Sequence, residues 1–385
     1  MTIERAVIEH GGALDRAIAR FGGNQADWLD LSTGINPEAF PLPEITPEVW
    51  NRLPDEALLD KALAAARSYY SVADGAFIVA APGTQALIQI VPELTQPGEV
   101  AILSPTYQEH HAAFARAGWA VLSCPDIGSI PATAKAVVVV NPNNPDGRIV
   151  PGDELLGLAQ KLGAHGGFLI VDEAFADAHP EVSIAGQAGG DHLIILKSFG
   201  KFFGLAGLRL GFAISGAGIA KRLSERLGPW AVSGPALAIA VHAFCPSPLP
   251  SPREVRGEGG LDVDALSFVP GAAVEEGGGD ADVSLSPSKR GEGKGEGQNV
   301  TILGAFRARL LARRALLSAV LQRSGFEEIG GTALFALVHH EQAQALYEHL
   351  CHRHILTRKF DYAPNWLRIG LADEAGLERL EEALR

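Results

Sequence analysis

The sequence predicts an α/β fold, in which a large domain with a mostly parallel sheet of seven strands flanked by helices is followed by a small α+β domain. Three observations predict it. Seven short apolar runs recur before residue 215, and segments with helical spacing lie between several of them. A single break in composition then precedes a shorter region of helices and strands.

The seven apolar runs are continuous rather than alternating, which is typical of strands buried on both faces. Helical spacing recurs in the segments 85–94, 110–117 and 153–162. Buried strands that alternate with helices indicate a layered domain with a mostly parallel sheet. The runs lie at residues 76–80, 100–103, 120–123, 136–140, 168–171, 193–196 and 210–214.

The composition breaks between residues 246 and 299, where 23 of the 54 residues are Gly, Pro or Ser. Such a segment buries too little apolar surface to offset the entropy that it would lose on ordering. We therefore expect a disordered surface insertion that splits a helical region. A functional lid is the alternative, and the scarcity of aromatic anchors in the segment counts against it.

After this insertion, the spacing predicts helices at 305–323 and 342–353, and apolar runs predict strands at 332–338 and 366–370. These elements would form the small domain. We expect the chain to divide into an N-terminal arm that contributes to the small domain and the substrate site (1–40), a large cofactor-binding domain (41–245), the insertion (246–299) and the small domain (300–385).

The chain carries 32 basic and 45 acidic residues, a formal charge of −13. Nucleic acids and anionic membranes reward a basic face, so neither is expected as a partner, and the Arg-rich helix at 305–323 is interpreted as solvated. Three cysteines are too few and too scattered for a disulfide framework or a zinc site, and we expect no metal. The sequence shows neither a signal peptide nor a membrane span, so we expect a cytoplasmic protein.

Polar motifs follow several of the predicted strands. Gly83 and Thr84 come after the run 76–80 and open a helix, whose free N–H groups suit a phosphate, although a plain helix cap would have the same sequence. Asn144 lies in the loop 141–147, where two prolines would hold its amide in place. A structural turn is the alternative for this loop.

Two charged residues follow buried strands. Asp172 comes directly after the run 168–171, and a buried carboxylate is costly unless it meets a cation, a metal or a protonated heterocycle. Lys201 follows the run 193–196 in a small, apolar, Gly-rich setting, where desolvation would make its amine a nucleophile.

These groups would meet at the carboxyl ends of the strands of one sheet, where open α/β sheets bind ligands. Pyridoxal 5′-phosphate would use all of them: the lysine for its aldehyde, the carboxylate for its pyridinium nitrogen, and the helix N-terminus for its phosphate. The sequence therefore predicts this cofactor.

The same motifs resemble those of fold-type-I pyridoxal-phosphate enzymes of the class I and II aminotransferase family, over nearly the whole chain except the insertion. The resemblance rests on the segments 141–147 (NPNNPDG), 171–175 (VDEAF) and 198–211 (SFGKFFGLAGLRLG). It implies that Lys201 bonds the cofactor aldehyde and that Asp172 holds the pyridine nitrogen. It further implies that Asn144 contacts the ring 3-oxygen, that Tyr107 stacks on the ring, that the phosphate is held by Gly83, Thr84, Ser198 and Arg209, and that Arg368 clamps the substrate carboxylate.

Two positions depart from the family pattern. Phe175 stands where many relatives have Tyr, so one hydrogen bond to the ring 3-oxygen is in doubt. Leu53 stands where relatives often have a Tyr that reaches the cofactor phosphate of the neighbouring subunit. The resemblance still implies a homodimer.

Two branches of the family act on small phosphorylated substrates: histidinol-phosphate aminotransferases and the L-threonine-O-3-phosphate decarboxylases of cobalamin biosynthesis. The segments 9–12, 29–37, 228–235 and 331–335 resemble the decarboxylases more closely. The resemblance implies a lyase that releases CO₂ from threonine phosphate. We expect Arg358, His10 and Ser32, with Asn144 and Arg368, in the substrate site; a solvated N-terminal histidine is the alternative for His10.

A third hypothesis is a catalytically inactive scaffold that keeps the fold without the reaction. It would be consistent with each motif taken singly, because each has a structural explanation. The lysine and the carboxylate distinguish the two cases, since an intact pair predicts a yellow, cofactor-bearing protein.

The composition of the insertion generates a first prediction. Deleting residues 246–299 should leave the activity and the thermal unfolding temperature largely unchanged, because the segment lacks a buried apolar pattern. Melting monitored by circular dichroism, together with an activity assay, checks it. Collapse of folding in the shortened chain would show that the insertion is structural.

Overall fold

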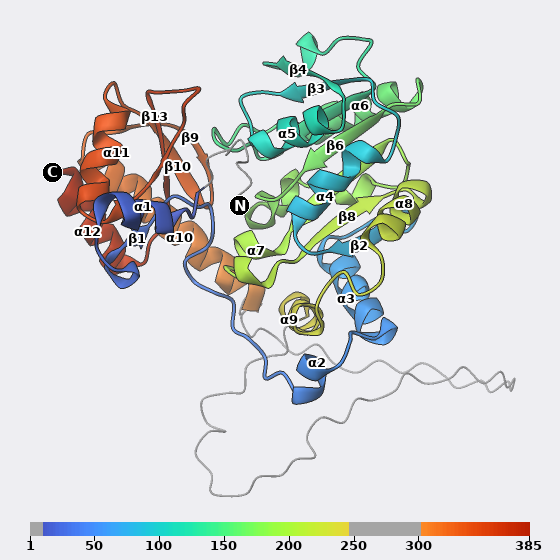
Figure 1. Cartoon of the computed structure of the whole chain (residues 1–385), viewed down its shortest axis with the longest axis horizontal. Helices are drawn as coiled ribbons and strands as arrows, with labels where there is room; N and C mark the ends of the chain where they lie inside the picture. Colours follow the sequence, from blue (N-terminus) through green and yellow to red (C-terminus); the bar gives the residue numbers. More distant parts are fainter. Residues whose placement is uncertain (1–10, 246–301) are drawn as a thin grey trace, which may run out of the picture. The chain divides into compact units, whose positions relative to one another are not determined.

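The central sheet contains all seven predicted strands (Figure 1). The computed structural model describes residues 11–245 and 302–385, so His10 and the segment 246–299 lie outside the described residues. The strand order is β2-β8-β7-β6-β5-β3-β4. The strands are β2 (Phe77–Ala81), β3 (Glu99–Leu103), β4 (Ala120–Cys124), β5 (Ala136–Val140), β6 (Phe168–Asp172), β7 (Leu193–Ser198) and β8 (Gly211–Ser215).

The sheet is mostly parallel, as predicted, and only β8 runs against both of its neighbours. Every residue of β5, β6 and β7 is buried, which explains their unbroken apolar runs. Alternate side chains, such as Val138 and Ile170, pack with helices α4, α5 and α8 on one face. These helices are α4 (Thr84–Ile90), α5 (Gln108–Arg116) and α8 (Ala217–Leu227).

The other described helices of this region are α2 (Pro47–Asn51), α3 (Glu56–Tyr69), α6 (Gly152–Gly163), α7 (Phe199–Phe202) and α9 (Gly234–Phe244). The predicted helix 85–94 is divided in the structure: α4 ends at Ile90, and a 3₁₀ turn covers Val91–Glu93. Pro92 accounts for this change, because proline lacks the N–H that would continue an α-helix.

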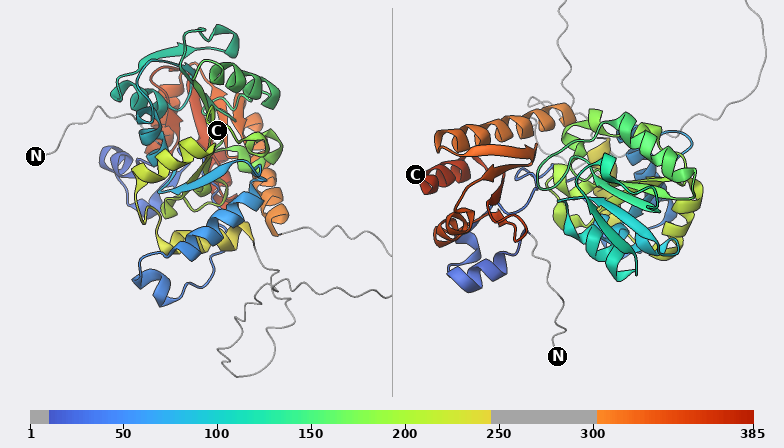
Figure 2. Two further views of the ribbon diagram at one scale, coloured as in Figure 1. Left: turned by 90° about the vertical axis from the view of Figure 1, so that its right-hand side faces the viewer. Right: turned by 90° about the horizontal axis from the view of Figure 1, so that it is seen from above.

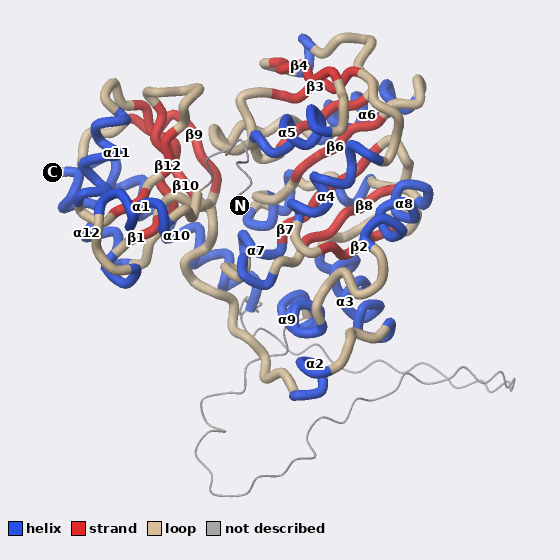
Figure 3. Tube along the Cα trace, in the orientation of Figure 1, coloured by secondary structure: helices blue, strands red, loops and turns tan. Residues whose placement is uncertain are grey.

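The small domain is built on a four-stranded antiparallel sheet in the order β12-β13-β10-β9. The strands of this sheet are drawn in red in Figure 3. The predicted strand 332–338 is in fact a hairpin, in which Thr332 ends β9 and pairs with Phe335 at the start of β10. Its elements are α10 (Ile302–Arg323), β9 (Glu327–Thr332), β10 (Phe335–His339), α11 (Ala343–His352), β11 (Ile355–Leu356), β12 (Arg358–Lys359), β13 (Trp366–Gly370) and α12 (Glu374–Leu384).

Residues near the N-terminus lie with this small domain (Figure 2). Strand β1 (Leu29–Asp30) pairs in parallel with β11, and helix α1 (Leu14–Phe21) packs on α11. Ala17 and Trp28 share a buried cluster with Cys351 and Leu356. The chain then crosses to the large domain beside α7, where the N–H of Asn36 donates to the carbonyl of Lys201 at 3.0 Å.

Among the described residues, no helix is long and apolar enough to cross a membrane. The same residues contain no cluster of three or more His, Cys, Asp or Glu side chains that could hold a metal ion.

Candidate functional site

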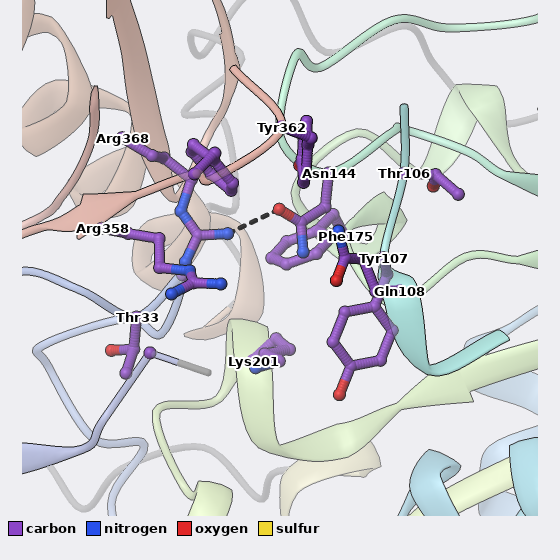
Figure 4. Close-up of a pocket in the computed structure, with 13 residues that line it drawn as sticks. Thr33, Thr106, Tyr107, Gln108, Asn144, Phe175, Lys201, Arg358, Tyr362 and Arg368 are labelled. Atoms are coloured by element: carbon purple, nitrogen blue, oxygen red, sulfur yellow. Dashed lines mark hydrogen bonds between the residues drawn. The ribbon is translucent and has the colours of Figure 1, made fainter. Parts of the chain in front are cut away.

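Two adjoining cavities open at the carboxyl ends of the central strands. The first, of about 140 Å³, lies over β6, β7 and the start of α4. The second, of about 130 Å³, lies between the large domain and strands β12 and β13 of the small domain (Figure 4). Four residues line both cavities: Tyr107, Asn144, Phe175 and Lys201. A molecule in the first cavity would therefore meet a molecule in the second at these side chains.

The first cavity brings together all eight residues that the sequence predicts for the cofactor. They come from segments more than a hundred positions apart, and the parallel strands bring their ends to one edge of the sheet. The eight residues are Gly83, Thr84, Tyr107, Asn144, Asp172, Ser198, Lys201 and Arg209.

Asp172 is the last residue of β6, and its side chain is buried. Its Oδ2 lies 2.9 Å from Nε2 of His110, and its Oδ1 accepts a hydrogen bond of 3.1 Å from the backbone N–H of Ala174. The carboxylate is thus oriented by two partners. Asp172 also lines the cavity, where the same carboxylate can meet a protonated ring nitrogen.

His110 is a site residue that the sequence analysis missed. It is buried on the inner face of α5 together with Ala113 and Phe114. The spacing i, i+3, i+4 could have placed it on that apolar face. Nothing in the sequence pairs it with Asp172.

Lys201 lies in α7, the short helix that follows β7, and its ammonium nitrogen is 5.8 Å from the centre of the Phe175 ring. Burial lowers the pKa of Lys201 to about 8, with a further lowering from Arg368 that outweighs the opposing effect of Asp172. A large fraction of this amine is therefore neutral near pH 8, the form that attacks an aldehyde.

Gly83 and Arg209 form one end of the first cavity. Gly83 has φ of 83°, a conformation that favours glycine, and a Cβ atom there would lie 2.6 Å from Nη2 of Arg209. The absence of a side chain lets the guanidinium approach the backbone at the start of α4. Thr84 and Ser198 add hydroxyl groups to the same cavity.

The loop 141–147 holds Asn144 in place through the other two asparagines. The Asn141 side chain bonds both backbone groups of Val150, at 2.8 and 3.1 Å. The Asn143 amide donates to the carbonyl of Pro105 and to Asp146. Asn144 is left to face the cavities, where its Oδ1 accepts a hydrogen bond from Arg368 at 2.5 Å.

Arg368, on β13, is only 6% exposed and lines the second cavity. Its Nη1 donates to Asn144, as Figure 4 shows. Its Nη2 donates to the carbonyl of Ser32 at 2.6 Å. Its Nε is buried and has no hydrogen-bond partner among the described residues. Burial lowers the pKa of Arg368 to about 10. A buried guanidinium with an unused donor fits an anionic group in this cavity.

The remaining substrate residues have different placements. Arg358 lines the second cavity, as expected. Ser32 does not line it: its hydroxyl donates to Asp30 at 2.5 Å and accepts from the backbone of Gly12, while its carbonyl holds Arg368. His10 lies outside the described residues.

Gln85 is a second residue that the sequence analysis did not single out for this role. Its Oε1 accepts a hydrogen bond of 3.2 Å from the Tyr107 hydroxyl, and its Nε2 donates to Glu109 at 2.6 Å. The residue directly after Gly83 and Thr84 thus orients the aromatic ring that lines both cavities.

The environment of Lys201 predicts how it reacts. In the cofactor-free protein, its acetylation rate should rise with pH through a midpoint near 8, because desolvation favours the neutral amine. The Arg368→Met variant should have a higher midpoint, since it removes a neighbouring positive charge. Mass spectrometry of peptides after timed acetylation measures both, with exposed Lys221 as the internal reference. An unchanged midpoint in the variant would contradict the proximity of the two cations.

Comparison with known proteins shows which family the chain resembles in sequence. A family model described as "Aminotransferase class I and II" matches residues 38–256. A threonine-phosphate decarboxylase from Sinorhizobium sp is 44% identical, with 98% of both chains covered. A threonine-phosphate decarboxylase from Pseudomonas aeruginosa is 38% identical, with 98% of this chain and 97% of the relative covered.

Among solved structures, the histidinol-phosphate aminotransferase from Sinorhizobium meliloti, in complex with pyridoxal-5′-phosphate, has the same fold. It aligns with a TM-score of 0.69 and 17% sequence identity, over 98% of this chain and 94% of that one. From the family model and the two relatives of nearly full length, the chain belongs to the class I and II aminotransferase family.

Proposed function

We propose that this protein is a pyridoxal-phosphate-dependent decarboxylase. It converts L-threonine O-3-phosphate to CO₂ and (R)-1-amino-2-propanol O-2-phosphate in cobalamin biosynthesis. The observation that carries the proposal is the pair of adjoining cavities, with Lys201 lining both and a buried cation in the second. The similarity to two threonine-phosphate decarboxylases over nearly the full length supports the choice of substrate.

The residues of the first cavity fit pyridoxal 5′-phosphate. Because Gly83 has no Cβ, the Arg209 guanidinium lies close to the backbone at the start of α4, and this positive group in the cavity suits a phosphate. Asp172 would hold the pyridinium nitrogen, Lys201 the aldehyde carbon and Asn144 the 3-oxygen, while Tyr107 would stack on the ring. Thr84 and Ser198 would complete the phosphate site. When bound, the cofactor supplies a ring that accepts the electron pair released at the substrate α-carbon.

The second cavity would bind the substrate. Arg368 has one unused buried donor, and we assign it to the substrate carboxylate. Arg358 lines the same cavity and would bind the substrate phosphate, with help from His10. Ser32 would act indirectly, since its carbonyl positions Arg368. Lys201 would return a proton to the α-carbon after CO₂ leaves.

Orientation of the substrate decides which reaction follows, because a decarboxylase must weaken the bond to the carboxylate and an aminotransferase the bond to the α-hydrogen. A histidinol-phosphate aminotransferase would use the same side chains and is the second candidate. An inactive scaffold is the third, and the lowered pKa of Lys201 argues against it, because a scaffold needs no reactive amine.

A substrate assay separates these candidates. The purified, cofactor-loaded protein should release CO₂ from threonine phosphate without any 2-oxo acid. Turnover only with histidinol phosphate and 2-oxoglutarate would support the aminotransferase instead. A colourless protein that takes up no pyridoxal phosphate would support the scaffold.

Replacing the reactive amine tests the site. Lys201→Ala should abolish CO₂ release and remove the absorbance band that borohydride bleaches in the wild-type protein, because no other lining residue supplies an amine. Lys221→Met, at an exposed side chain of α8, is the matched control and should keep both. Full turnover by the alanine variant would refute the assignment.

We also infer a homodimer. Three large apolar side chains are exposed around α2: Leu42, Trp50 and Leu53, at 59%, 64% and 65%. Exposed apolar groups in one short segment indicate a surface that is covered in the assembly. Leu53 is the second residue after the end of α2, so the position at which relatives carry a cross-subunit Tyr would lie on this surface.

Light scattering coupled to gel filtration checks the dimer. The wild-type protein should elute at twice the mass of 40.5 kDa, and Trp50→Lys should shift it towards the monomer, because a charge would be buried in the contact. A wild-type monomer at micromolar concentration would contradict this inference.

The domain boundaries stated above stay predictions, as does a cytoplasmic location. A phosphorylated amino acid is the partner that the second cavity supports, and neither a nucleic acid nor a membrane is proposed.

A further inference from the structure

A second group of buried charges lies beside the site but lines neither of its two cavities. Glu173 directly follows Asp172 at the end of β6, and Lys197 directly precedes Ser198 on β7. Successive side chains of a strand project to opposite faces of the sheet. Asp172 accordingly meets His110 of α5, whereas Glu173 meets Lys197 and the segment around Ser183.

The Glu173 carboxylate is fully buried, and three donors surround it. Lys197 Nζ forms an ion pair with Oε2, and the Ser183 hydroxyl donates to the same oxygen at 2.6 Å. The backbone N–H of Ile184 donates to Oε1 at 2.9 Å. Lys197, itself 1% exposed, also donates to the Ser183 oxygen at 2.9 Å. The ion pair is therefore held in one geometry.

Asp177 extends this group. It is 4% exposed, and its Oδ2 has no hydrogen-bond partner among the described residues. Burial raises the pKa of Asp177 to about 7; the charge of Glu173 acts in the same direction, and Lys197 and Arg307 act against it. The Asp177 carboxyl is therefore coupled electrostatically to both members of the ion pair and to Arg307.

Arg307 connects this group to helix α10. Its Nε donates to the backbone carbonyl of Asp177 at 3.3 Å. Its guanidinium carbon lies 5.7 Å from the centre of the Phe202 ring, and Phe202 is the neighbour of Lys201 in α7. Phe306 of α10 packs edge-on against the same ring at 5.3 Å. The group and the lysine helix thus share contacts with one helix.

We propose that Glu173, Lys197 and Asp177 form a positioning unit for the reaction, which holds the strand ends that carry Asp172 and Lys201 and links them to α10. The unit touches neither cavity, so it acts through the backbone of β6, β7 and α7. The inference rests on the proposed function, because it concerns the relative placement of that carboxylate and that amine.

The reason is geometric. Breaking a buried ion pair leaves a charge without compensation, and the neighbouring backbone shifts to hydrate it. Glu173 and Lys197 adjoin Asp172 and Ser198, so that shift reaches the cofactor site directly. A misplacement of about 1 Å in an active site can lower the rate about 100-fold.

The test uses the cofactor-loaded protein. Lys197→Met should lower kcat for CO₂ release by about tenfold or more, while KM changes less than about twofold, because substrate contacts remain. The pH midpoint of the cofactor absorbance band should shift as well. Lys197→Arg keeps the positive charge, so its kcat and its absorbance midpoint should stay close to the wild-type values. Asp177→Asn should shift the midpoint less, since it leaves the ion pair intact.

A double variant separates positioning from stability. Glu173→Gln with Lys197→Met removes both charges and should recover much of the lost melting temperature, because neither member of the pair is left as an unpaired buried charge. If the pair positions the site, kcat of the double variant stays below the wild-type value and its absorbance midpoint stays shifted. The double variant also serves if Lys197→Met fails to fold. Lys221→Met, in the exposed pair with Glu225, is the control.

The proposal is overturned if the single and double variants change only the melting temperature and keep the wild-type kcat and midpoint. Failure of the positioning proposal can be told apart from failure of the proposed function. A wild-type protein that binds cofactor but releases no CO₂ would contradict the function alone, and the absorbance midpoint would still test the positioning unit.

Discussion

Burial of charge at the carboxyl ends of β6 and β7 is the constraint on which the rest of the site depends. Strands buried on both faces offer almost no water to the side chains at their ends, so each charged group there needs a partner. Asp172 has His110, Glu173 has Lys197, and Lys201 has a lowered pKa instead. The same desolvation that makes these groups costly makes the lysine reactive.

The consecutive carboxylates Asp172 and Glu173 divide two tasks between the faces of one strand. Asp172 lines the cofactor cavity, whereas Glu173 is closed off by Lys197, Ser183 and Ile184. Alternation of side chains along the strand makes this division possible without any added loop. A reactive site and a structural ion pair can therefore be built from adjacent residues.

The small domain contributes a buried arginine to the site, in addition to Arg358. Arg368 is held by Asn144 of the large domain and by the carbonyl of Ser32 near the N-terminus. Close backbone approach helps to bring these parts together: a Cβ at Gly147 would lie 1.7 Å from the carbonyl oxygen of Gly331, and the N–H of Gly331 donates to the Asp146 carbonyl at 3.0 Å. Substrate binding between the domains would thus depend on contacts made far from the cofactor.

The sequence by itself determined the seven strands, because an unbroken apolar run has only a buried layer in which to lie. It also determined which residues could gather round a cofactor, since parallel strands end at one edge of the sheet. The spacing of apolar residues predicted the wrong extent of two elements. A turn after Thr332 divides the predicted strand into a hairpin, and Pro92 ends the predicted α-helix early.

Only the tertiary structure decided which buried groups are partners. His110 and Asp172 are 62 positions apart, and Asn144 and Arg368 are 224 positions apart. Ser32 carries no sequence signal that its carbonyl, rather than its hydroxyl, supports the site. Such pairings follow from packing of distant elements, which the periodicity of a single segment does not contain.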